Sequence, residues 1–591
     1  MRPAATIGDL VCAQGGIFRD REAIIQHDQT ALTYGELAER VDLWSSALGQ
    51  YARIGLCLPA GPELAVALLA ASSRAACAPL SPASPAAQLA RDHRDLGLDL
   101  IVTTEPRCAE LRQLGVPATP SPDLIPAAPD RPGGRRQADT GAGPAEPDDV
   151  ALLLRTSGTT GRPKVVPLTH ANLCAGAANV RRTLGLGPDD RCLNAMPLWH
   201  GHGFVAGLLA SLAAGASVIC VPSDAARDFP GLLHRTGATW YTATPALHRA
   251  ILDAVAERPA PSHRLRFVRS ASSRLPRSLA AELENTFGVP VIEAYGMTEA
   301  AHQITSDSLP PRHRGNGSVG AAAGGTRVAI LGPDGTRLAA GEQGEVVIQG
   351  GGLFQGYEND PTNGSAFIDG WFRTGDLGRL DDDGYLFLTG RIREMINRGG
   401  ETIAPREVDE MLLEHPDVTD AVAFGIPHSR FGEVVAAAVV PRLGSTVTEA
   451  DLRQFAWVRL DPAKVPVKIA LAADLPRGAT GKPDYAELRK LVTARSGPAE
   501  IDGYAAGIAG QLAGTWAELL GIHQVSLTDS LSELGSDSLR CTRMANHIAA
   551  TFGVQVRTDE LLVADTVVEQ AVLVHDYLDA EGTPDAPGQD S

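Results

Sequence analysis

The sequence predicts three folds in succession: a large α/β domain, a small α+β subdomain and an all-α domain of four helices. Strand-like and helical stretches alternate from the N-terminus to about residue 390, and this alternation is typical of an α/β sheet. A shorter mixed unit follows, and after a polar gap come about 75 residues of mainly helical periodicity. We therefore expect domains at 1–390, 391–493 and 503–578, with a linker at 494–502 and a flexible tail at 579–591.

Hydrophobic spacing places the first elements of the α/β domain. Helical spacing covers 34–48, a strand-like run covers 53–58, and an apolar helix is expected at 63–75. The stretch 117–149 is dense in Pro, Gly, Asp and Arg, and we expect it to form a long surface excursion or a disordered loop. The sheet should resume with a buried strand at 150–154.

The smaller unit has signals of its own. A helix is expected at 405–413, and strands are expected at 418–424 and 434–440. The gap at 494–502 is polar, which is why we expect the helical domain to begin after it.

Composition narrows the class of function. The formal net charge of -18 over 591 residues argues against non-specific binding to nucleic acid and provides no polybasic patch for a membrane. Eight cysteines are scattered without a Cys-x-x-Cys pair, which favours reduced thiols over a disulfide frame or a zinc site. There is no apolar run of about 18 residues and no signal-peptide core, so we expect a cytoplasmic protein that binds small molecules and other proteins.

The most informative stretch is a turn rich in hydroxyls and glycines. It runs from Arg155 to Lys164 and reads Arg-Thr-Ser-Gly-Thr-Thr-Gly-Arg-Pro-Lys. Glycine lets backbone N–H groups converge on an anion, and Lys164 or Arg162 can supply charge. A Walker A loop needs Lys and then Ser or Thr directly after its second Gly, but Gly161 is followed by Arg162. The turn therefore predicts a phosphate-binding loop of another kind. The alternative is a mobile hairpin that binds no ligand.

Four further clusters carry residues suited to nucleotide chemistry, at 293–299, 370–378, 390–401 and 475–482. In the first, Glu299 is placed to hold Mg²⁺ and Thr298 to reach a phosphate, although such a pair can also simply cap a helix. In the second, Asp376 can accept hydrogen bonds from two ribose hydroxyls, although a lone Asp in a turn is more often structural. The last two are flanked by glycines and present cations.

In this order and at these separations, the five clusters resemble the adenylate-forming superfamily of acyl-CoA synthetases, nonribosomal-peptide adenylation domains and luciferases. The resemblance runs from about residue 32 to about residue 490. It implies a large N-terminal subdomain, a small mobile C-terminal subdomain, and the cofactors ATP and Mg²⁺, the latter held by Glu299. It also assigns nucleotide contacts to Thr156, Ser157, Gly158, Thr159, Thr160, Gly161, Lys164, Ser273, Glu293, Ala294, Tyr295, Thr298, Asp376 and Arg391.

The same resemblance implies a reaction. A carboxylate attacks the α-phosphorus of ATP and expels pyrophosphate, and Lys482 is the implied catalytic lysine because negative charge builds up while two anions approach. Arg393 lies at the hinge about which the small subdomain rotates, so it gates the site and takes no part in the chemistry. Many relatives carry Asp or Lys at this hinge, and Arg is a modest departure.

The C-terminal unit has a motif of its own. Its sequence from Asp529 to Leu539 resembles the phosphopantetheine attachment site of acyl and peptidyl carrier proteins. Ser538 is then the serine to which a phosphopantetheinyl transferase adds 4'-phosphopantetheine, and it should open an amphipathic helix whose N-terminus favours the added phosphate. The alternative is that Asp537 or Ser538 merely caps this helix. A carrier fused to an adenylating unit raises the effective concentration of its thiol at the active site.

The acyl pocket is expected to begin at 196–204, where His200 resembles the residue that gates the carboxylate. Three polar patches converge behind it by family position: His202, then Ser270 with Ser272, and His302 with Gln303. Amino-acid-activating relatives place an Asp in this region, and none is found here. The stretch 293–306 looks like oxalate-CoA ligases in particular, and an apolar tail would leave buried donors unpaired at about 1–3 kcal/mol each. We expect a small polar or dicarboxylic acid such as oxalate, and the alternative is that the histidines bond only within the core beside a wider pocket.

The leading hypothesis is an ATP-dependent ligase that adenylates a small carboxylic acid and loads it onto its own carrier, as a loading didomain of a nonribosomal-peptide or polyketide pathway. One alternative is a free acyl-CoA ligase with an appended docking domain. Another is a scaffold with a dead adenylating domain, against which the presence of Lys482, Glu299 and Asp376 argues. The sequence shows no condensation or thioesterase unit, so a separate acyltransferase or synthase is expected to accept the acyl group.

Overall fold

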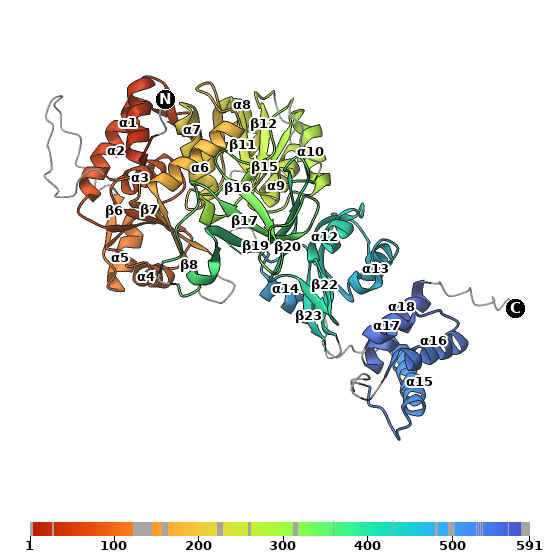
Figure 1. The fold of residues 1–591 in the computed structure, drawn as a ribbon. Coiled ribbons are helices and arrows are strands. Elements are labelled where there is room, and N and C mark those ends of the chain that lie inside the picture. Colours follow the sequence, from red (N-terminus) through yellow and green to blue (C-terminus); the bar gives the residue numbers. More distant parts are fainter. Residues whose placement is uncertain are drawn as a thin grey trace. The chain divides into compact units, whose positions relative to one another are not determined.

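The structure is a computed structural model (Figure 1). It describes residues 4–26, 29–121, 145–156, 164–221, 228–257, 262–310, 317–358, 360–428, 431–478, 483–494, 503–527, 529, 531, 534, 536–564 and 566–580. The chain divides into two compact units, Met1–Leu388 and Thr389–Ser591.

A nine-stranded sheet forms the centre of the first unit, in the order β15-β14-β13-β12-β11-β9-β10-β1-β2. Its strands are β1 (Glu22–Ile25), β2 (Ala31–Thr33), β9 (Arg191–Asn194), β10 (Ser217–Cys220), β11 (Trp240–Ala243), β12 (Phe267–Ser270), β13 (Val291–Tyr295), β14 (Thr305–Ser306) and β15 (Ala321–Ala322). The run from β13 to β1 is parallel. The carboxyl ends of β9, β11, β12 and β13 therefore reach one edge of the sheet, which is where open α/β sheets bind their ligands.

A second sheet of six strands has the order β6-β5-β3-β4-β7-β8. Its strands are β3 (Arg53–Leu56), β4 (Ala76–Pro79), β5 (Leu100–Thr103), β6 (Ala118–Pro120), β7 (Val150–Thr156) and β8 (Lys164–Thr169). The strands predicted at 53–58 and 150–154 are confirmed. The loop predicted from residue 117 is wrong at its start, because β6 pairs with β5 as a short edge strand, and edge strands tolerate proline. Residues 122–144 of that stretch lie outside the described residues.

The helices of the first unit follow from capping and apolar spacing. Thr33 begins α2 (Tyr34–Leu48) by exchanging hydrogen bonds with Glu36, which is a capping box. This helix confirms the prediction at 34–48, and the largely buried α3 (Pro62–Ser72) confirms the one at 63–75. The remaining elements are α1 (Ile7–Ile17), α4 (Ala86–Asp95), α5 (Glu105–Gln113), α6 (His170–Thr183), α7 (Ala210–Ala213), α8 (Phe229–Thr236), α9 (Pro245–Glu257), α10 (Arg277–Phe287), α11 (Asn363–Ala366), the π-helix η2 (His202–Leu209) and the 3₁₀ turn η4 (Thr298–Ala300).

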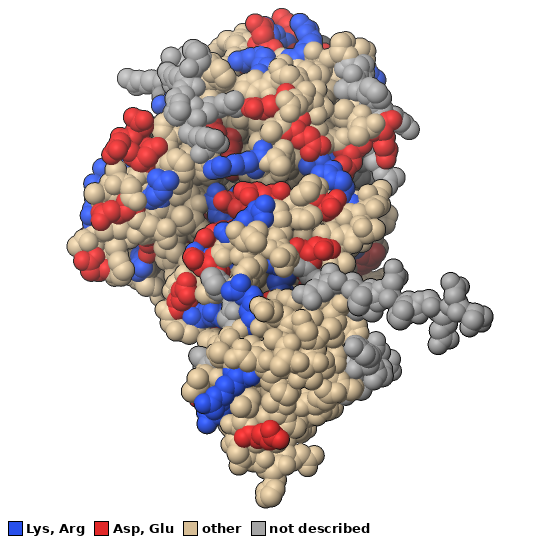
Figure 2. All heavy atoms as spheres, turned by 90° about the vertical axis from the view of Figure 1, so that its right-hand side faces the viewer, with Lys and Arg blue, Asp and Glu red and all other residues tan. Residues whose placement is uncertain are grey.

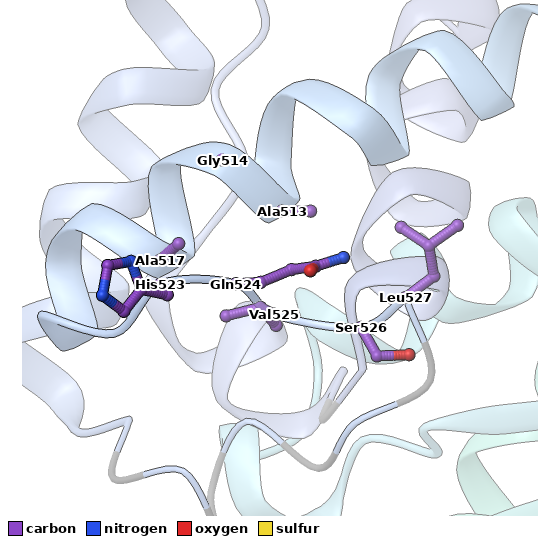
Figure 3. Close-up of a pocket in the computed structure, with 8 residues that line it drawn as sticks. All are labelled: Ala513, Gly514, Ala517, His523, Gln524, Val525, Ser526 and Leu527. Atoms are coloured by element: carbon purple, nitrogen blue, oxygen red, sulfur yellow. The ribbon is translucent and has the colours of Figure 1, made fainter.

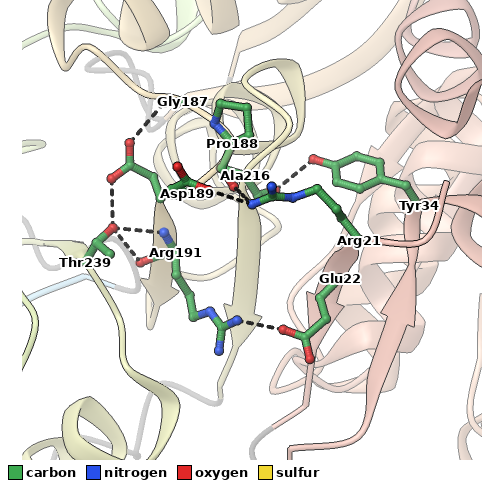
Figure 4. Close-up of polar contacts among 10 residues, drawn as sticks. Arg21, Glu22, Tyr34, Gly187, Pro188, Asp189, Arg191, Ala216 and Thr239 are labelled. Atoms are coloured by element: carbon green, nitrogen blue, oxygen red, sulfur yellow. Dashed lines mark hydrogen bonds and ion pairs between the residues drawn. The ribbon is translucent and has the colours of Figure 1, made fainter. Parts of the chain in front are cut away.

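Polar contacts join the N-terminal segment of this unit to the large sheet (Figure 4). Arg191, at the start of β9, pairs with Glu22 of β1 at 2.6 Å. The buried Tyr34 hydroxyl donates to the Ala216 carbonyl oxygen at 2.7 Å. These bonds hold β1 and α2 against the strands whose ends carry the site.

A third sheet has the order β16-β17-β19-β18, and β20 pairs with β19. Its strands are β16 (Arg327–Leu331), β17 (Gly344–Gln349), β18 (Phe367–Ile368), β19 (Trp371–Leu380) and β20 (Leu386–Arg391). Phe354 packs edge-to-face on Phe372 of β19, with ring centroids 5.2 Å apart, and this aromatic contact stabilises the strand that carries Asp376.

The second unit begins with a small α+β fold in the strand order β22-β21-β24-β23, and β25 pairs with β24. Its elements are β21 (Ile396–Arg398), β22 (Glu401–Ile403), α12 (Pro405–Leu413), β23 (Val418–His428), β24 (Gly432–Pro441), α13 (Glu449–Trp457), η5 (Pro462–Lys464), β25 (Lys468–Leu471) and α14 (Tyr485–Ala494). The helix predicted at 405–413 is confirmed. The two predicted strands are also confirmed, and both extend a few residues further than expected.

Four helices follow: α15 (Gly503–Leu520), α16 (Ser538–Phe552), α17 (Thr558–Val563) and α18 (Val567–Ala580). They confirm the all-α prediction. Buried Trp516 donates from Nε1 to Gln570 Oε1 at 2.6 Å, and the Gln570 amide donates to the carbonyl oxygens of Leu561 and Ala564, both at 3.0 Å. Because every member is bonded, this network fixes how α15, α17 and α18 pack.

On the face drawn in Figure 2, basic and acidic side chains are interspersed. That face therefore offers no broad cationic surface to nucleic acid. Among the helices that the structure describes, none is long and apolar enough to cross a membrane.

Candidate active site

The strands on either side of the predicted phosphate loop form an antiparallel pair. Thr156 ends β7, Lys164 begins β8, and the two residues are register partners. The predicted contacts between them lie outside the described residues: Ser157, Gly158, Thr159, Thr160 and Gly161. Arg155 forms a hydrogen bond with Asp92 and an ion pair with Asp95 at 3.3 Å, so its charge joins the end of β7 to α4.

Lys164 is held by residues far along the chain. Its Nζ donates to Thr362 Oγ1 at 2.5 Å, lies 3.4 Å from an Asp360 carboxylate oxygen, and lies 4.4 Å from the centroid of the Tyr357 ring. The Tyr357 hydroxyl donates to Glu299 Oε1 at 2.8 Å. The lysine of the predicted phosphate loop and the predicted Mg²⁺ ligand therefore share Tyr357 as a neighbour.

Glu299 lies in η4, the single turn that Thr298 begins directly after β13. Its side chain is buried, and within the described part of the chain it pairs with no cation. A buried carboxylate is costly when it is unpaired, and nucleotide sites commonly hold Mg²⁺ with one or two carboxylates plus phosphate oxygens. The described residues contain no cluster of three or more His, Cys, Asp or Glu that could hold a metal alone. Glu299 fits Mg²⁺ on these grounds, with ATP as the source of the other ligands.

Asp376 and Tyr295 are bonded to each other. The hydroxyl of Tyr295, at the end of β13, donates to the buried Asp376 carboxylate on β19. This contact brings together two predicted nucleotide contacts from different sheets. Glu293, another predicted nucleotide contact, accepts from the Leu275 backbone N–H at 3.2 Å, and Ala294 is buried in β13. Contacts within the protein therefore fix the positions of both residues.

His202 begins the π-helix η2, which follows β9. The π-helix is rare and frequently found at functional sites. Gly203 permits the tight approach of the preceding turn, since a Cβ there would lie 2.3 Å from the Pro197 carbonyl oxygen. His202 is buried, whereas His200, which we predicted to gate the carboxylate, is half-buried in that turn.

A fully buried arginine, Arg269, lies between the two predicted pocket histidines. Its Nη1 lies 3.2 Å from His202 Nε2, and its Nη2 lies 3.0 Å from His302 Nε2. Nη1 also donates to Thr242 Oγ1 at 3.2 Å, and Nη2 donates to Gln303 Oε1 at 3.1 Å. The two imidazole rings stack with centroids 4.8 Å apart. The prediction that His202 and His302 converge is thus met, with a cation between them that the motifs did not reveal.

The predicted serines lie at and just after the end of β12. Ser272 Oγ is 2.8 Å from His202 Nδ1. Ser270 is fully buried, and its Oγ and the Nε of Arg269 have no hydrogen-bond partner among the described residues. Ser273 is half-buried. Buried polar atoms rarely stay unpaired in folded proteins, so the two atoms without a partner favour a polar ligand or water here.

Backbone strain accumulates beside these side chains. Ser272 (φ 76°), Ala301 (φ 45°) and His302 (φ 87°) are non-glycine residues with left-handed backbone. Such conformations cost on the order of 1–3 kcal/mol each and cluster at functional sites. Gly296 permits the turn after β13, since a Cβ there would lie 1.4 Å from the His302 carbonyl oxygen.

Burial sets the charge of the cluster formed by Arg269, His202 and His302. It holds the pKa of His202 well below the ordinary value, helped by His302 and Arg269, and it does the same to the pKa of His302, helped by Arg269. Burial also lowers the pKa of Arg269 to about 10, so the guanidinium stays charged at pH 7 while both imidazoles are neutral. Within the described residues no acidic side chain pairs with Arg269. The cluster therefore holds one buried positive charge.

Three residues predicted for the adenylation reaction belong to the second unit. Arg391 ends β20, and the Glu394 backbone N–H closes the next turn by donating to the Arg391 carbonyl oxygen at 3.0 Å. Arg393, the predicted hinge, is exposed in that turn. Lys482, the predicted catalytic lysine, lies outside the described residues.

The predicted attachment site lies at a helix N-terminus. Ser538 is the first residue of α16, and Asp537 caps the helix by accepting from the Arg540 backbone N–H at 2.8 Å. A hollow of about 370 Å³ on this helical part (Figure 3) is lined by Ala513, Gly514, Ala517, His523, Gln524, Val525, Ser526 and Leu527. None of the predicted site residues is among them.

The fold and the site together define an adenylate-forming ligase joined to a carrier. The parallel sheet has polar residues at its strand ends, a small α+β unit follows, and the helical unit has a serine at the start of a helix. The chain belongs to the AMP-binding enzyme family: residues 13–358 match the AMP-binding enzyme, 407–482 its C-terminal domain and 510–573 the phosphopantetheine attachment site. It is therefore an enzyme of the acid-thiol ligase class that uses ATP.

Curated relatives extend over most of the chain. A probable CoA ligase of Humulus lupulus is 41% identical over 81% of this chain and 94% of its own. An oxalate-CoA ligase of Arabidopsis thaliana is 40% identical over 79% and 94%, and a sulfoacetate-CoA ligase of Cupriavidus necator is 37% identical over 81% and 96%. The solved o-succinylbenzoate coenzyme A synthetase of Bacillus subtilis, in complex with ATP and magnesium ion, matches with a TM-score of 0.71 and 26% identity over 81% of this chain and 99% of that one.

Two residues of the site were missed by the sequence reasoning. Arg269 is the lone charge of β12, every residue of which is buried, and a charge in a strand buried on both faces was the available signal. Tyr357 follows β17 in an irregular segment, and nothing in its local sequence links it to Glu299.

Proposed function

We propose that this protein adenylates a short carboxylic acid bearing a second anionic group, oxalate or an acid of similar size, and transfers the acyl group to the pantetheine thiol on its own Ser538. The observation that carries the substrate proposal is Arg269, buried between two neutral histidines without an acidic partner among the described residues. A buried charge is costly unless it is compensated. The second anionic group of the acid can supply that compensation, whereas an apolar tail cannot.

Two further facts support a substrate acid with a second anionic group. The relatives named for oxalate and for sulfoacetate both act on acids with a second anionic group. The unpaired Ser270 Oγ and Arg269 Nε lie in the same cluster, and a polar ligand or an ordered water would satisfy them better than a methylene chain.

In the first step, a carboxylate oxygen of the acid forms a bond to the α-phosphorus of ATP, and the bond from that phosphorus to the bridging oxygen breaks as pyrophosphate leaves. We assign the phosphates to Thr156, Lys164 and the loop between them, and the ribose to Asp376 with Tyr295 and Arg391. Lys482 offsets the negative charge that builds up at the α-phosphate. Mg²⁺, held by Glu299, would neutralise phosphate charge when bound.

In the second step, the pantetheine thiol loses its proton to solvent, its sulfur bonds to the acyl carbon, and the carbon–oxygen bond to the phosphate breaks, so that AMP leaves. The phosphate of the arm would sit at the N-terminus of α16, where the helix dipole favours an anion. A phosphopantetheinyl transferase must install the arm, and a separate acyltransferase or synthase must accept the acyl group, as in nonribosomal-peptide or polyketide pathways of the cytoplasm. Rotation of the small subdomain about Arg393 would switch the enzyme from the first step to the second.

A free acyl-CoA ligase is the second candidate, and the specific observation that favours it is the naming of the relatives as CoA ligases. In that case free coenzyme A is the acceptor, and the helical domain only docks other proteins.

Intact-protein mass spectrometry separates these candidates. The protein, first modified by a phosphopantetheinyl transferase, is incubated with ATP, Mg²⁺ and oxalate, malonate, sulfoacetate, glyoxylate or acetate, both without and with free coenzyme A. We expect the mass of the acyl group of an anionic-tailed acid on the arm, and no gain in Ser538→Ala, which should keep its pyrophosphate exchange. Efficient acyl-CoA formation without any gain on Ser538 would instead establish the free ligase.

A further inference from the structure

Arg269 contacts two histidines that the proposed function places beside the acid. We propose that Arg269 is a positioning residue that holds His202 and His302 in the neutral form whose proton is on Nδ1. The pocket then presents hydrogen-bond donors to the second anionic group of the acid, and the positive charge of Arg269 lies behind these donors. The purpose of this arrangement rests on the proposed function. The arrangement of protons concerns the protein alone and can be measured without substrate.

Hydrogen-bond chemistry fixes the two tautomers. A guanidinium only donates, so His302 Nε2, 3.0 Å from Arg269 Nη2, accepts. Thr242 Oγ1 accepts from Nη1 at 3.2 Å and donates its one proton to His202 Nε2 at 2.6 Å. A neutral imidazole whose Nε2 accepts carries its proton on Nδ1. His202 therefore donates from Nδ1 to Ser272 Oγ at 2.8 Å.

The groups around the two rings all favour the neutral form. After burial, which is the main cause, the pKa of His202 is lowered by His302, the guanidinium, His200 and His248, and that of His302 is lowered by the guanidinium and His200. Cys192 faces the guanidinium, but burial raises the pKa of its thiol well above the ordinary value, so it provides no negative charge at pH 7. Within the described residues, no carboxylate bonds to either ring. A proton added to a ring would place a second positive charge beside Arg269.

This arrangement selects for charge at the far end of the acid. Ser272 accepts from His202, so its own hydroxyl proton remains available to donate, and the Nδ1–H of His302 is a second donor. A carboxylate or sulfonate accepts from both and is attracted by the charge behind them, and bonds to an ionised acceptor are roughly twice as strong as neutral ones. A methyl or phenyl group would leave both donors unpaired.

Nuclear magnetic resonance of the full-length protein with ¹⁵N-labelled histidine tests the proton positions directly. Long-range ¹H–¹⁵N spectra distinguish a protonated from an unprotonated ring nitrogen, and His202→Gln and His302→Gln assign the signals. We expect Nδ1–H and unprotonated Nε2 for both rings between pH 6 and 8. A proton on Nε2 of either ring, or a cationic ring at pH 7, would overturn the proposal whether or not any Arg269 variant folds.

Variants test what Arg269 does through the histidines. In Arg269→Met we expect the pKa of both rings to rise, because the neighbouring positive charge is gone while burial still holds it down. We expect kcat/KM for oxalate relative to acetate to fall by more than about tenfold at pH 8, and to recover in part at lower pH as imidazolium replaces the lost charge. Arg269→Lys should keep the rings neutral and recover part of the preference. The matched control is Arg266→Met on the same segment, because the Arg266 guanidinium pairs with Asp190 and lies over the Phe267 ring, and within the described residues no hydrogen bond joins it to either histidine. This variant should keep the wild-type profile.

Two outcomes separate this inference from the proposed function. A folded Arg269→Met protein with a pH-independent, unchanged preference would overturn the role of Arg269. If no acid with a second anionic group supports pyrophosphate exchange while the spectra show both rings as Nδ1–H, the proposed substrate is wrong and the positioning by Arg269 stands.

Discussion

At the residue scale, Asp376 gives the sharpest test of the nucleotide site. Its buried carboxylate already accepts a hydrogen bond from Tyr295, and we propose that it also accepts from ribose. Asp376→Asn preserves the shape but removes the charge and part of the acceptor capacity, so KM for ATP should rise roughly 10- to 100-fold, while KM for the acid changes little. Pyrophosphate exchange measures both constants. Asp334→Asn, in an exposed turn, is the control, and an unaltered KM for ATP in Asp376→Asn would exclude the ribose contact.

Lys482 is a second residue whose role can be isolated. If it stabilises charge at the α-phosphate, Lys482→Ala should lower kcat for adenylation by about 10²–10³-fold. Transfer from a preformed acyl-adenylate to the thiol should be nearly unchanged, because the proposed rotation removes the lysine before that step. Lys490→Ala is the control, since Lys490 is exposed and pairs with Glu487 at 2.8 Å. An equal loss in both half-reactions would indicate a structural role instead.

The polar residues of the pocket could be predicted from sequence more easily than the cation between them. His202 and His302 lie in segments rich in glycine and polar residues, where a motif can be recognised from the sequence. Arg269 lies inside a fully buried strand, and its importance depends on Thr242, its direct register partner on β11. Register between strands that are far apart in sequence is a tertiary property, so local patterns do not contain it.

At the element scale, the turn after β13 depends on one glycine. A Cβ on Gly296 would lie 1.4 Å from the His302 carbonyl oxygen, so Gly296→Ala must displace the strained segment that carries Ala301 and His302. We expect a loss of roughly 1–3 kcal/mol in the free energy of unfolding, measured by urea titration, together with a large loss of adenylation. Gly325→Ala is the matched control, because nothing lies within 4 Å of its added Cβ. Wild-type activity in Gly296→Ala would show that this turn does not position the site.

Elements with local signals were the predictable ones. The bounds of α2 and α12 match the expected residues because apolar spacing and, for α2, the capping box at Thr33 define them within the chain. The strands β23 and β24 were expected too short, since their ends are set by pairing with each other from Val418 to His428. The π-helix η2 was not foreseen, because its wide turns are stabilised by packing and leave no periodicity in the sequence.

At the scale of the whole molecule, the fusion of ligase and carrier predicts transfer within one chain. A mixture of Lys482→Ala, which adenylates only slowly, with Ser538→Ala, which has no arm, should load less than about one tenth of what the wild-type protein loads in the same short time at micromolar concentration. Intact mass measures the loading, and the wild-type protein diluted to the same active-site concentration is the reference. Efficient loading in the mixture would mean that the carrier serves other copies as readily as its own.

The pH dependence of stability is also a property of the whole first unit, because four histidines with lowered pKa values are buried in it: His170, His202, His248 and His302. Burial lowers the pKa of His248 to about 3, whereas in the unfolded chain a histidine titrates near about 6.5. As the pH falls below this value, the unfolded chain binds protons that the folded chain excludes, so the free energy of unfolding falls by up to about 1.4 kcal/mol per pH unit for each histidine.

Urea titrations followed by tryptophan fluorescence should therefore show nearly constant stability from pH 7 to 8.5 and a steady decline from pH 6.5 to 4.5. Carboxylates contribute to that decline as well, and the comparison of variants separates the two. His248→Gln should make the slope shallower, because it removes one proton taken up on unfolding, whereas the exposed His523→Gln should leave it unchanged. An identical slope in His248→Gln and wild type would mean that His248 is protonated in the folded state, and the burial that keeps this cluster neutral would have to be reconsidered.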